Sequence, residues 1–369
     1  MTILNWEVGL KSGVIKKIIQ HTQTFDKLGY SVDLIYVKNS CKEIFLLSEN
    51  GEYRLGKSKG IKGISYYNII RKVVGKAYSV IYVRHSGRID PWVLGVLKEA
   101  KRNGLQVVYE FPTFPYDGHA YSFANKLDLL VDFACRGVLK KYVDLTVNWE
   151  RISETYGIPS IALETGIVVQ NVKMIESQEL DDTIDLIAVA SIQPYHKYDK
   201  IIRAMHSYYS QGGKRNIVFH IVGEGRNKKK YMDLVSELEL DSRVIFYGEK
   251  QGEELDSIYE KADIGIGTLG WYTVGVFNTS GALKLREYAA KGLPIISGTK
   301  EEIFQSTIGE YYFEVPNDDT DIQMDNIVNF YDSVYGKNKK QDVHCTIRNF
   351  TIENWSMENT LSPLVRYFN

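Results

Sequence analysis

Residues 278–297 read NTSGALKLREYAAKGLPIIS and predict a turn, a helix and a strand in direct succession. Small residues at 279–281 precede the helix, and its first two turns carry Lys284 and Glu287. The first N–H groups of a helix have no partner inside it, and the positive end of the helix dipole attracts anions. Lys284 adds a full charge, and Glu287 can accept hydrogen bonds from sugar hydroxyls. The stretch therefore predicts a site for a nucleotide diphosphate joined to a sugar.

The rest of the chain alternates between apolar runs and amphipathic runs. From residue 183 onward, the apolar runs IDLIAVAS, NIVFHIVGEG, RVIFYG, DIGIGTL and LPIIS are separated by segments with helical spacing. The first half has the same rhythm, from MTILNW through SVDLIYV, SVIYVRH, LQVVYEF, DLTVN and SIALETGI, with a hairpin expected around Asn50-Gly51. This alternation with short loops predicts α/β domains whose parallel sheets are covered on both faces by helices.

The length of the chain predicts two domains. Its 369 residues exceed one ordinary core, and the segment 172–183 is polar and acidic, as linkers are. We expect Rossmann-like domains over residues 1–170 and 183–343. A helical tail over residues 344–369 is too short to be a domain and must pack on one of them.

Composition places the chain among ordinary globular proteins. It is 44% hydrophobic and 25% charged, contains no apolar run of about 18 residues, and begins without the layout of a signal peptide. We therefore expect a cytoplasmic protein. The three cysteines are widely spaced and lack histidines at metal-ligand spacing, which argues against a disulfide framework or a zinc site.

Charge is distributed unevenly along the chain. Residues 1–168 contain 23 Lys and Arg against 16 Asp and Glu, a balance of +7, which leaves 22 against 30, or −8, for the remainder. Each basic residue close to an anionic bilayer contributes about 1 kcal/mol of attraction. Peripheral contact of the first domain with the inner face of the plasma membrane is one interpretation, and solvated lysine-rich helices are the other. No nucleic-acid motif accompanies the KKK triplet at 228–230, so no nucleic-acid partner is expected.

Three motifs resemble those of a known enzyme family. DIGIG at 263–267, together with EYAAKGLP at 287–294, is similar to the nucleotide-sugar segment of family-4 glycosyltransferases. YHKYDK at 195–200 and EFPTFPY at 110–116 resemble two further motifs of the bacterial polysaccharide-assembly enzymes in that family, which build capsule, exopolysaccharide or O-antigen. The three motifs occur in the family's order, and the resemblance covers essentially the whole chain.

The resemblance implies the GT-B fold, in which two doubly wound Rossmann-like domains face each other across a cleft and a C-terminal helix packs back on the first domain. It implies that the C-terminal domain binds the donor and the N-terminal domain binds the acceptor. Such enzymes retain the anomeric configuration and need no bound metal or other cofactor. The nucleotide sugar is then a co-substrate, with UDP favoured over GDP.

The resemblance also assigns candidate site residues. Lys284 would neutralise the leaving diphosphate, and Glu287 would bind the ribose unless it pairs with a neighbouring lysine. Thr279 stands where the family has a carboxylate, which leaves backbone N–H groups near Ser280 as donors to the diphosphate. The donor-binding candidates are Gly13, Gly223, Glu224, Gly225, Thr279, Ser280, Gly281, Ala282, Leu283, Lys284 and Glu287, and the catalytic candidates are Lys284, Glu110 and His196.

Several of these candidates have an ordinary structural interpretation as well. His196 can hydrogen-bond a phosphate, which would favour its charged form, or can be a structural loop residue. The glycines around Glu224 and Gly13 can allow close approach of a ligand or can simply permit tight turns. Glu110 ends an apolar strand, where it can orient or deprotonate an acceptor hydroxyl or can cap the following turn. Asp117 and His119 are loose substitutes for a histidine that the family has near residue 112.

The resemblance therefore implies a retaining, metal-independent glycosyltransferase that transfers a sugar to a glycan or lipid-linked acceptor. A non-catalytic GT-B subunit that binds a glycan or a partner enzyme is the alternative, favoured by Thr279 and opposed by Lys284 and Glu287. A sugar-nucleotide epimerase on the same fold is a third interpretation, opposed by the absence of its expected paired carboxylates from the sequence.

Overall fold

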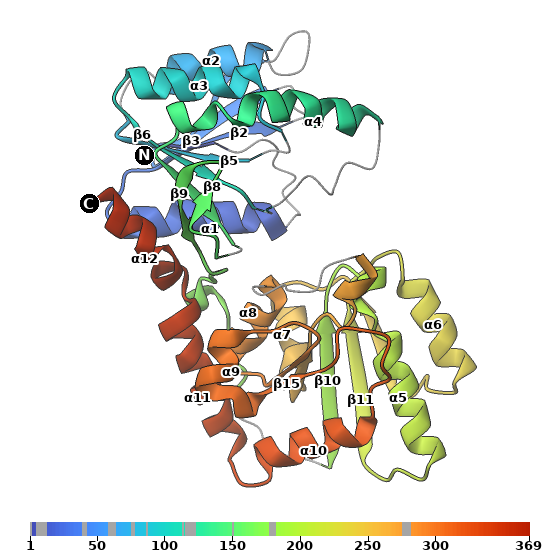
Figure 1. Ribbon diagram of the computed structural model, residues 1–369. Coiled ribbons are helices and arrows are strands. Elements are labelled where there is room, and N and C mark those ends of the chain that lie inside the picture. Colours follow the sequence, from blue (N-terminus) through green and yellow to red (C-terminus); the bar gives the residue numbers. More distant parts are fainter. Residues whose placement is uncertain are drawn as a thin grey trace. The chain divides into compact units, whose positions relative to one another are not determined.

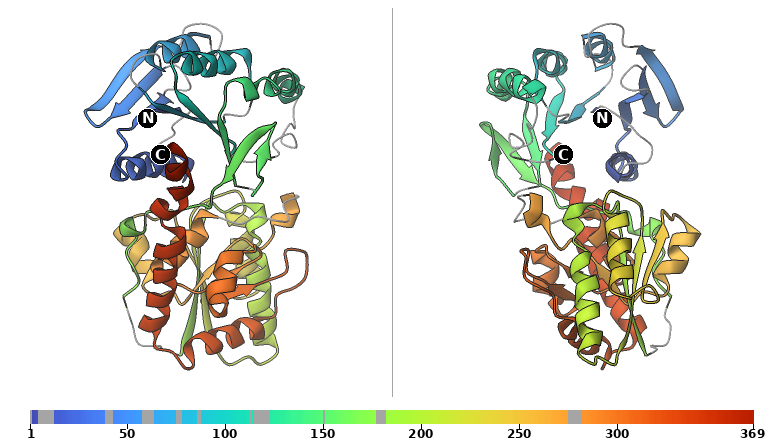
Figure 2. Two further views of the ribbon diagram at one scale, coloured as in Figure 1. Left: turned by 60° about the vertical axis from the view of Figure 1, so that its left-hand side comes forward. Right: turned by 90° about the vertical axis from the view of Figure 1, so that its right-hand side faces the viewer.

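The structure is a computed structural model that describes residues 2–4, 13–38, 43–57, 64–74, 78–85, 88–112, 114, 123–149, 151–176, 182–274 and 282–369. The chain divides into two compact units (Figures 1 and 2). Unit 1 contains Met1–Glu164 and Thr360–Asn369, and unit 2 contains Thr165–Asn359. The chain therefore passes between the units twice, after residue 164 and before residue 360.

Unit 1 is an α/β unit built on one mixed sheet. Its strands are β1 (Thr2–Leu4), β2 (Asp33–Lys38), β3 (Glu43–Ser48), β4 (Gly51–Lys57), β5 (Val80–Arg84), β6 (Gln106–Glu110), β7 (Leu145–Asn148), β8 (Glu154–Thr155) and β9 (Ile158–Ala162). They lie in the order β4-β3-β2-β1-β5-β6-β7-β9-β8. The run from β2 to β9 is parallel, whereas β3 and β4 form the antiparallel hairpin expected around Asn50-Gly51.

Helices cover both faces of this sheet. They are α1 (Gly13–Lys27), α2 (Ile64–Val74), α3 (Pro91–Arg102) and α4 (Phe123–Arg136), followed by the short helix η2 (Leu139–Lys141). Figure 1 shows α2, α3 and α4 on one face and α1 on the other. Local sequence explains where α3 begins, because the Asp90 side chain accepts hydrogen bonds from the N–H groups of Trp92 and Val93, and Pro91 occupies the first turn.

Unit 2 is a parallel α/β unit. Its strands are β10 (Thr183–Val189), β11 (Asn216–Val222), β12 (Val244–Gly248), β13 (Ile264–Ile266), β14 (Ile295–Ser297) and β15 (Tyr312–Glu314). They lie in the order β12-β11-β10-β13-β14-β15, and every pair is parallel. The inner strands β10, β11, β13 and β14 are mostly apolar and buried, as parallel strands between two helix layers must be, whereas the edge strands β12 and β15 are partly exposed. The parallel α/β class expected from the sequence is confirmed.

The helices of unit 2 are α5 (Asp199–Ser210), α6 (Lys228–Glu237), α7 (Glu253–Tyr259), α8 (Leu283–Lys291), α9 (Glu302–Ile308), α10 (Met324–Tyr335) and α11 (Lys340–Phe350), and α12 (Met357–Phe368) spans the boundary with unit 1. Figure 1 shows α5 and α6 on one side of the sheet and α7, α8 and α9 on the other. Ring contacts join Phe368 at the end of α12 to Phe25 and Tyr30 of unit 1. The last ten residues therefore pack with the N-terminal part of the chain.

Candidate functional site

The order of strands in unit 2 reverses between β10 and β13. In open α/β sheets, ligands bind outside the carboxyl ends of the strands at such a switch point. Two short helices follow these strand ends, η4 (Pro194–His196) after β10 and η5 (Trp271–Val274) after β13. They pack on each other, with the rings of Tyr195 and Trp271 stacked at 4.5 Å and the Leu269 N–H donating to the His196 carbonyl at 3.2 Å. The sheet topology thus brings His196 to the expected ligand-binding edge.

His196 is buried and held by its neighbours as a neutral imidazole. Its Nδ1 accepts a hydrogen bond from the Gln193 N–H at 3.0 Å, so the proton of the neutral ring is on Nε2. The ring stacks on Tyr198 with centroids 5.3 Å apart. Burial and then the charge of Lys284 lower the pKa of His196 to about 2. The protein's own groups thus oppose the charged form expected from the sequence, and Nε2–H is available only as a neutral donor.

Lys284 lies in the first turn of α8, as the sequence predicted. Its Nζ donates to the Tyr198 hydroxyl at 3.4 Å and lies 5.8 Å from the centroid of that ring. No carboxylate among the described residues pairs with Lys284. Burial lowers its pKa to about 7 although the residue as a whole is only half-buried. An ammonium without a counter-ion, held at a helix N-terminus, is arranged to receive an anion.

Glu287 lies one turn later on α8. Its Oε1 accepts a hydrogen bond from the Tyr259 hydroxyl at 3.5 Å, and Lys291 pairs instead with Asp256 at 2.6 Å. The alternative in which Glu287 pairs with Lys284 or Lys291 is therefore wrong. Its half-buried carboxylate keeps acceptor capacity for a ligand hydroxyl.

Gly223 and Gly225 allow the loop after β11 to approach the loop after β10. Their φ angles are +128° and +156°, and an added Cβ would lie 1.9 Å from the Ala190 oxygen and 2.2 Å from the Ile192 oxygen. The Ile192 N–H donates to the Glu224 carbonyl at 2.7 Å in the same contact. Backbone packing thus accounts for both glycines, and their role in donor binding stays a prediction.

Part of the predicted phosphate turn lies outside the described residues. Thr279, Ser280 and Gly281 belong to the segment 275–281, so nothing is said of their positions. Ala282 is the extended residue that precedes α8, with φ −63° and ψ 125°, and Leu283 is the first residue of the helix. The N–H groups predicted to face the diphosphate are those near Ser280 to Leu283, and of these the structure describes Ala282 and Leu283.

Comparison with known proteins gives a family match for residues 170–327, the part of the chain that contains β10 to α8. Residues 170–327 match the model described as glycosyl transferases group 1. The chain carries a group 1 glycosyl transferase domain. No relative of the sequence was detected among curated proteins.

Solved structures of other glycosyltransferases are similar to this one over the whole chain. A glycosyltransferase from Rickettsia africae ESF-5 is 12% identical with a TM-score of 0.66, over 100% of this chain and 97% of its own. The lipopolysaccharide outer core galactosyltransferase WaaB is 14% identical with a TM-score of 0.62, over 99% and 98%. Anabaena HepE in complex with UDP is 13% identical with a TM-score of 0.63, over 100% and 99%. At these identities the likeness shows the fold, and the GT-B fold expected from the sequence is confirmed.

Unit 1 of the glycosyltransferase contains the other predicted site residues. Glu110, the last residue of β6, is fully buried and forms an ion pair with Arg84 of β5. Burial opposes ionisation of this carboxyl group, but Arg84, His21 and Lys17 outweigh it and lower the pKa of Glu110. A paired carboxylate with a lowered pKa is a weak proton acceptor, so the arrangement favours a structural charge, and a catalytic role for Glu110 stays a prediction.

The sequence reasoning missed the partners of Glu110. Lys17 and His21 are four residues apart on α1, so they share one face of that helix, and both are buried. Polar residues at this spacing on an otherwise apolar face were the available signal. Gly13 is the first residue of α1, and Asp117 and His119 lie outside the described residues.

The described part of the glycosyltransferase contains no group of three or more His, Cys, Asp or Glu residues placed to hold a metal ion. No helix in the same part is long and apolar enough to cross a membrane.

Proposed function

We propose that this enzyme is a retaining, metal-independent transferase that moves a sugar from a nucleotide diphosphate sugar, UDP in preference to GDP, to a glycan or lipid-linked acceptor in polysaccharide or glycoconjugate synthesis. The observation that carries the proposal is Lys284 at the start of α8, an ammonium group with no carboxylate partner among the residues that the structure describes, beside the neutral His196. Similar structures named in complex with UDP, and with UDP and glucose, support the choice of base.

The chemistry assigned to these residues is electrostatic. The bond between the anomeric carbon and the diphosphate breaks, and the negative charge that develops on the leaving oxygen is stabilised by Lys284 and by the first N–H groups of α8. His196 would donate from Nε2 to the sugar or a phosphate oxygen, and Glu287 would accept from the ribose hydroxyls. The acceptor hydroxyl oxygen attacks from the face that the diphosphate leaves, which retains the configuration, and its proton passes to the leaving diphosphate oxygen. We assign no enzymic nucleophile.

Nucleotide binding tests the proposal directly. UDP should raise the Tm of the full chain more than GDP does, and a UDP-sugar should be hydrolysed slowly without an acceptor. The same donors with an acceptor panel should give products of unchanged anomeric configuration by NMR, and chelation of divalent metals should leave the rate unaltered. If no nucleotide stabilises the protein and no donor is hydrolysed, the proposal fails.

We also propose that unit 1 contacts the inner, anionic face of the plasma membrane. Leu130 and Phe133, three residues apart on α4, are 67% and 71% exposed, and the exposed Lys140 and Lys141 follow in η2. Apolar side chains that insert at an interface and lysines that meet anionic headgroups form a common peripheral anchor. The positive balance of residues 1–168 has the sign that this contact requires.

Vesicle flotation tests the membrane contact without any catalytic assay. The chain should float with vesicles of equal parts phosphatidylglycerol and phosphatidylcholine and remain in solution with phosphatidylcholine alone. A Leu130→Ser/Phe133→Ser variant should lose flotation. Met232→Ser removes an exposed apolar side chain from α6 of unit 2 and should have no effect. Equal flotation of the variant and the parent would reject this surface.

A further inference from the structure

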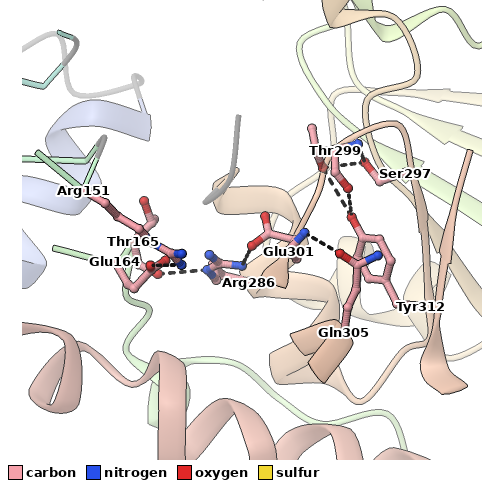
Figure 3. Close-up of polar contacts among 9 residues, drawn as sticks. All are labelled: Arg151, Glu164, Thr165, Arg286, Ser297, Thr299, Glu301, Gln305 and Tyr312. Atoms are coloured by element: carbon pink, nitrogen blue, oxygen red, sulfur yellow. Dashed lines mark hydrogen bonds and ion pairs between the residues drawn. The ribbon is translucent and has the colours of Figure 1, made fainter. Parts of the chain in front are cut away.

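Arg286 lies between Lys284 and Glu287 on α8 but is fully buried. Its Nη1 pairs with Glu301 Oε2 at 2.9 Å, its Nε donates to the Thr165 carbonyl oxygen at 2.9 Å, and its guanidinium carbon lies 3.5 Å from the centroid of the Trp355 ring. Figure 3 shows the side chain reaching from α8 between Thr165 and Glu301. One rigid planar group thus holds three parts of unit 2 together.

Two of these three parts are the places where the chain enters and leaves unit 2. Thr165 is the first residue of the unit, and Trp355 lies just before its end at residue 359. We call these two places the crossings, and two backbone hydrogen bonds of 2.9 Å join them. One runs from the Ile167 N–H to the Trp355 carbonyl oxygen, and the other runs from the Met357 N–H to the Ile167 carbonyl oxygen. Arg286 therefore connects α8 to both crossings at the point where they pair.

The third part, the loop after β14, is itself held firmly. The Glu301 N–H donates to Gln305 Oε1 at 3.1 Å. The hydroxyl oxygens of Ser297, at the end of β14, and Thr299, in the loop, lie 2.9 Å apart. The Tyr312 hydroxyl donates to the Thr299 carbonyl oxygen at 2.5 Å (Figure 3). The backbone of Glu301 is thus held in place, so its pair with Arg286 ties α8 to a fixed point of this loop as well as to the crossings.

We propose that Arg286 is a positioning residue that couples the nucleotide-binding start of α8 to the two chain crossings. The inference rests on the proposed nucleotide site. Coupling between two positions is reciprocal. Nucleotide bound at α8 should therefore reduce local opening of the backbone at the crossings, and loss of the Arg286 contacts should weaken nucleotide binding. A buried ion pair is often no more stabilising than apolar side chains of the same size, so its three directed contacts are better explained by the geometry that they fix.

Helix α8 provides a matched control in Lys291. This buried residue pairs with Asp256 at 2.6 Å, donates to the Lys173 oxygen at 3.1 Å and lies 4.4 Å from the centroid of the Tyr259 ring. It has the same kinds of partner on the same helix as Arg286, but it contacts neither crossing.

Hydrogen–deuterium exchange on the full chain tests the coupling. In the parent protein, saturating UDP should slow exchange of the first-turn amides of α8 and should slow the Ile167 and Met357 amides by about fivefold or more. In Arg286→Lys, the protection at α8 should remain while the UDP-dependent protection of the crossings disappears, and the Kd for UDP should rise by about fivefold or more.

Two further variants keep this test decisive. Arg286→Met/Glu301→Gln removes both charges of the pair, so it should fold even if Arg286→Lys does not, and it should give the same loss of coupling. Lys291→Met/Asp256→Asn should keep full UDP-dependent protection of the crossings and an unchanged Kd.

Protection at α8 without any at the crossings in the parent protein would overturn the inference, and so would full coupling in the Arg286 variants. If UDP protects neither α8 nor the crossings, the proposed nucleotide site fails and the inference fails with it.

Discussion

The affinity of this glycosyltransferase for UDP should fall as the pH rises above 7. Burial lowers the pKa of Lys284 to about 7 in the protein alone, so at pH 9 most molecules carry a neutral amine there. A diphosphate bound beside Lys284 favours the ammonium form and should return its pKa toward the ordinary value of about 10.4. UDP binding above pH 7 must then take up a proton, and the affinity decreases.

The size of the effect follows from these two pKa values. Between pH 7 and pH 9 the fraction of charged Lys284 falls from about one half to about one hundredth, so the Kd should rise by up to about 50-fold, equal to about 2.3 kcal/mol. The half-buried position of Lys284 allows some screening by water, so this figure is an upper limit. The UDP phosphates are already ionised at pH 7. His196 stays neutral, and burial raises the pKa of Tyr198 well above its ordinary range, so neither residue titrates here.

Isothermal titration calorimetry at pH 7, 8 and 9, in buffers of different ionisation enthalpy, measures both the Kd and the proton uptake. Lys284→Arg provides the control, because a guanidinium remains charged across this range. Its Kd should be nearly independent of pH. A parent Kd that is constant from pH 7 to pH 9, or an equal rise in Lys284→Arg, would refute the assignment of this group to the nucleotide.

Three further outcomes are expected. Lys284→Ala should lower kcat by about 10²-fold or more, as loss of one electrostatic donor commonly does, and near-normal turnover would contradict its role at the leaving group. Burial of His344 lowers its pKa to about 4, below the unfolded value of about 6.5, so stability is lost as the pH falls below 6.5. Between pH 7 and pH 5 this residue should cost up to about 2 kcal/mol, and in urea unfolding His344→Leu should be less sensitive to acid by that amount. Gly223→Ala should reduce the free energy of unfolding by about 2 kcal/mol or more, because φ is +128° and the new Cβ would lie 1.9 Å from the Ala190 oxygen. Gly95→Ala, on an open helix surface, should be neutral or slightly stabilising, and equal effects of the two substitutions would contradict this account.

Local sequence patterns predicted much of unit 2. Apolar runs of strand length and helical spacing located β10 to β14 and α5 to α8, and small residues followed by a periodic run located the start of α8. The strand β15 and the helices α9 to α11 were not assigned. A strand of three residues and a helix of seven are too short to show a clear period. The helices α10 and α11 carry an apolar stripe at helical spacing, so their signal was present in the sequence and was missed.

The sequence by itself determined the chemistry available at α8, because a lysine and a glutamate one turn apart at a helix start are fixed by spacing alone. Only the tertiary structure decided the state of these groups. Burial against Tyr198 lowers the pKa of Lys284, and burial near that lysine keeps His196 neutral, although the sequence had suggested a charged imidazole. The ion pair that occupies Glu110 and the contacts of Arg286 with Thr165, Glu301 and Trp355 join residues far apart in the chain. Desolvation and long-range contacts depend on which elements meet, and local periodicity carries no information about that.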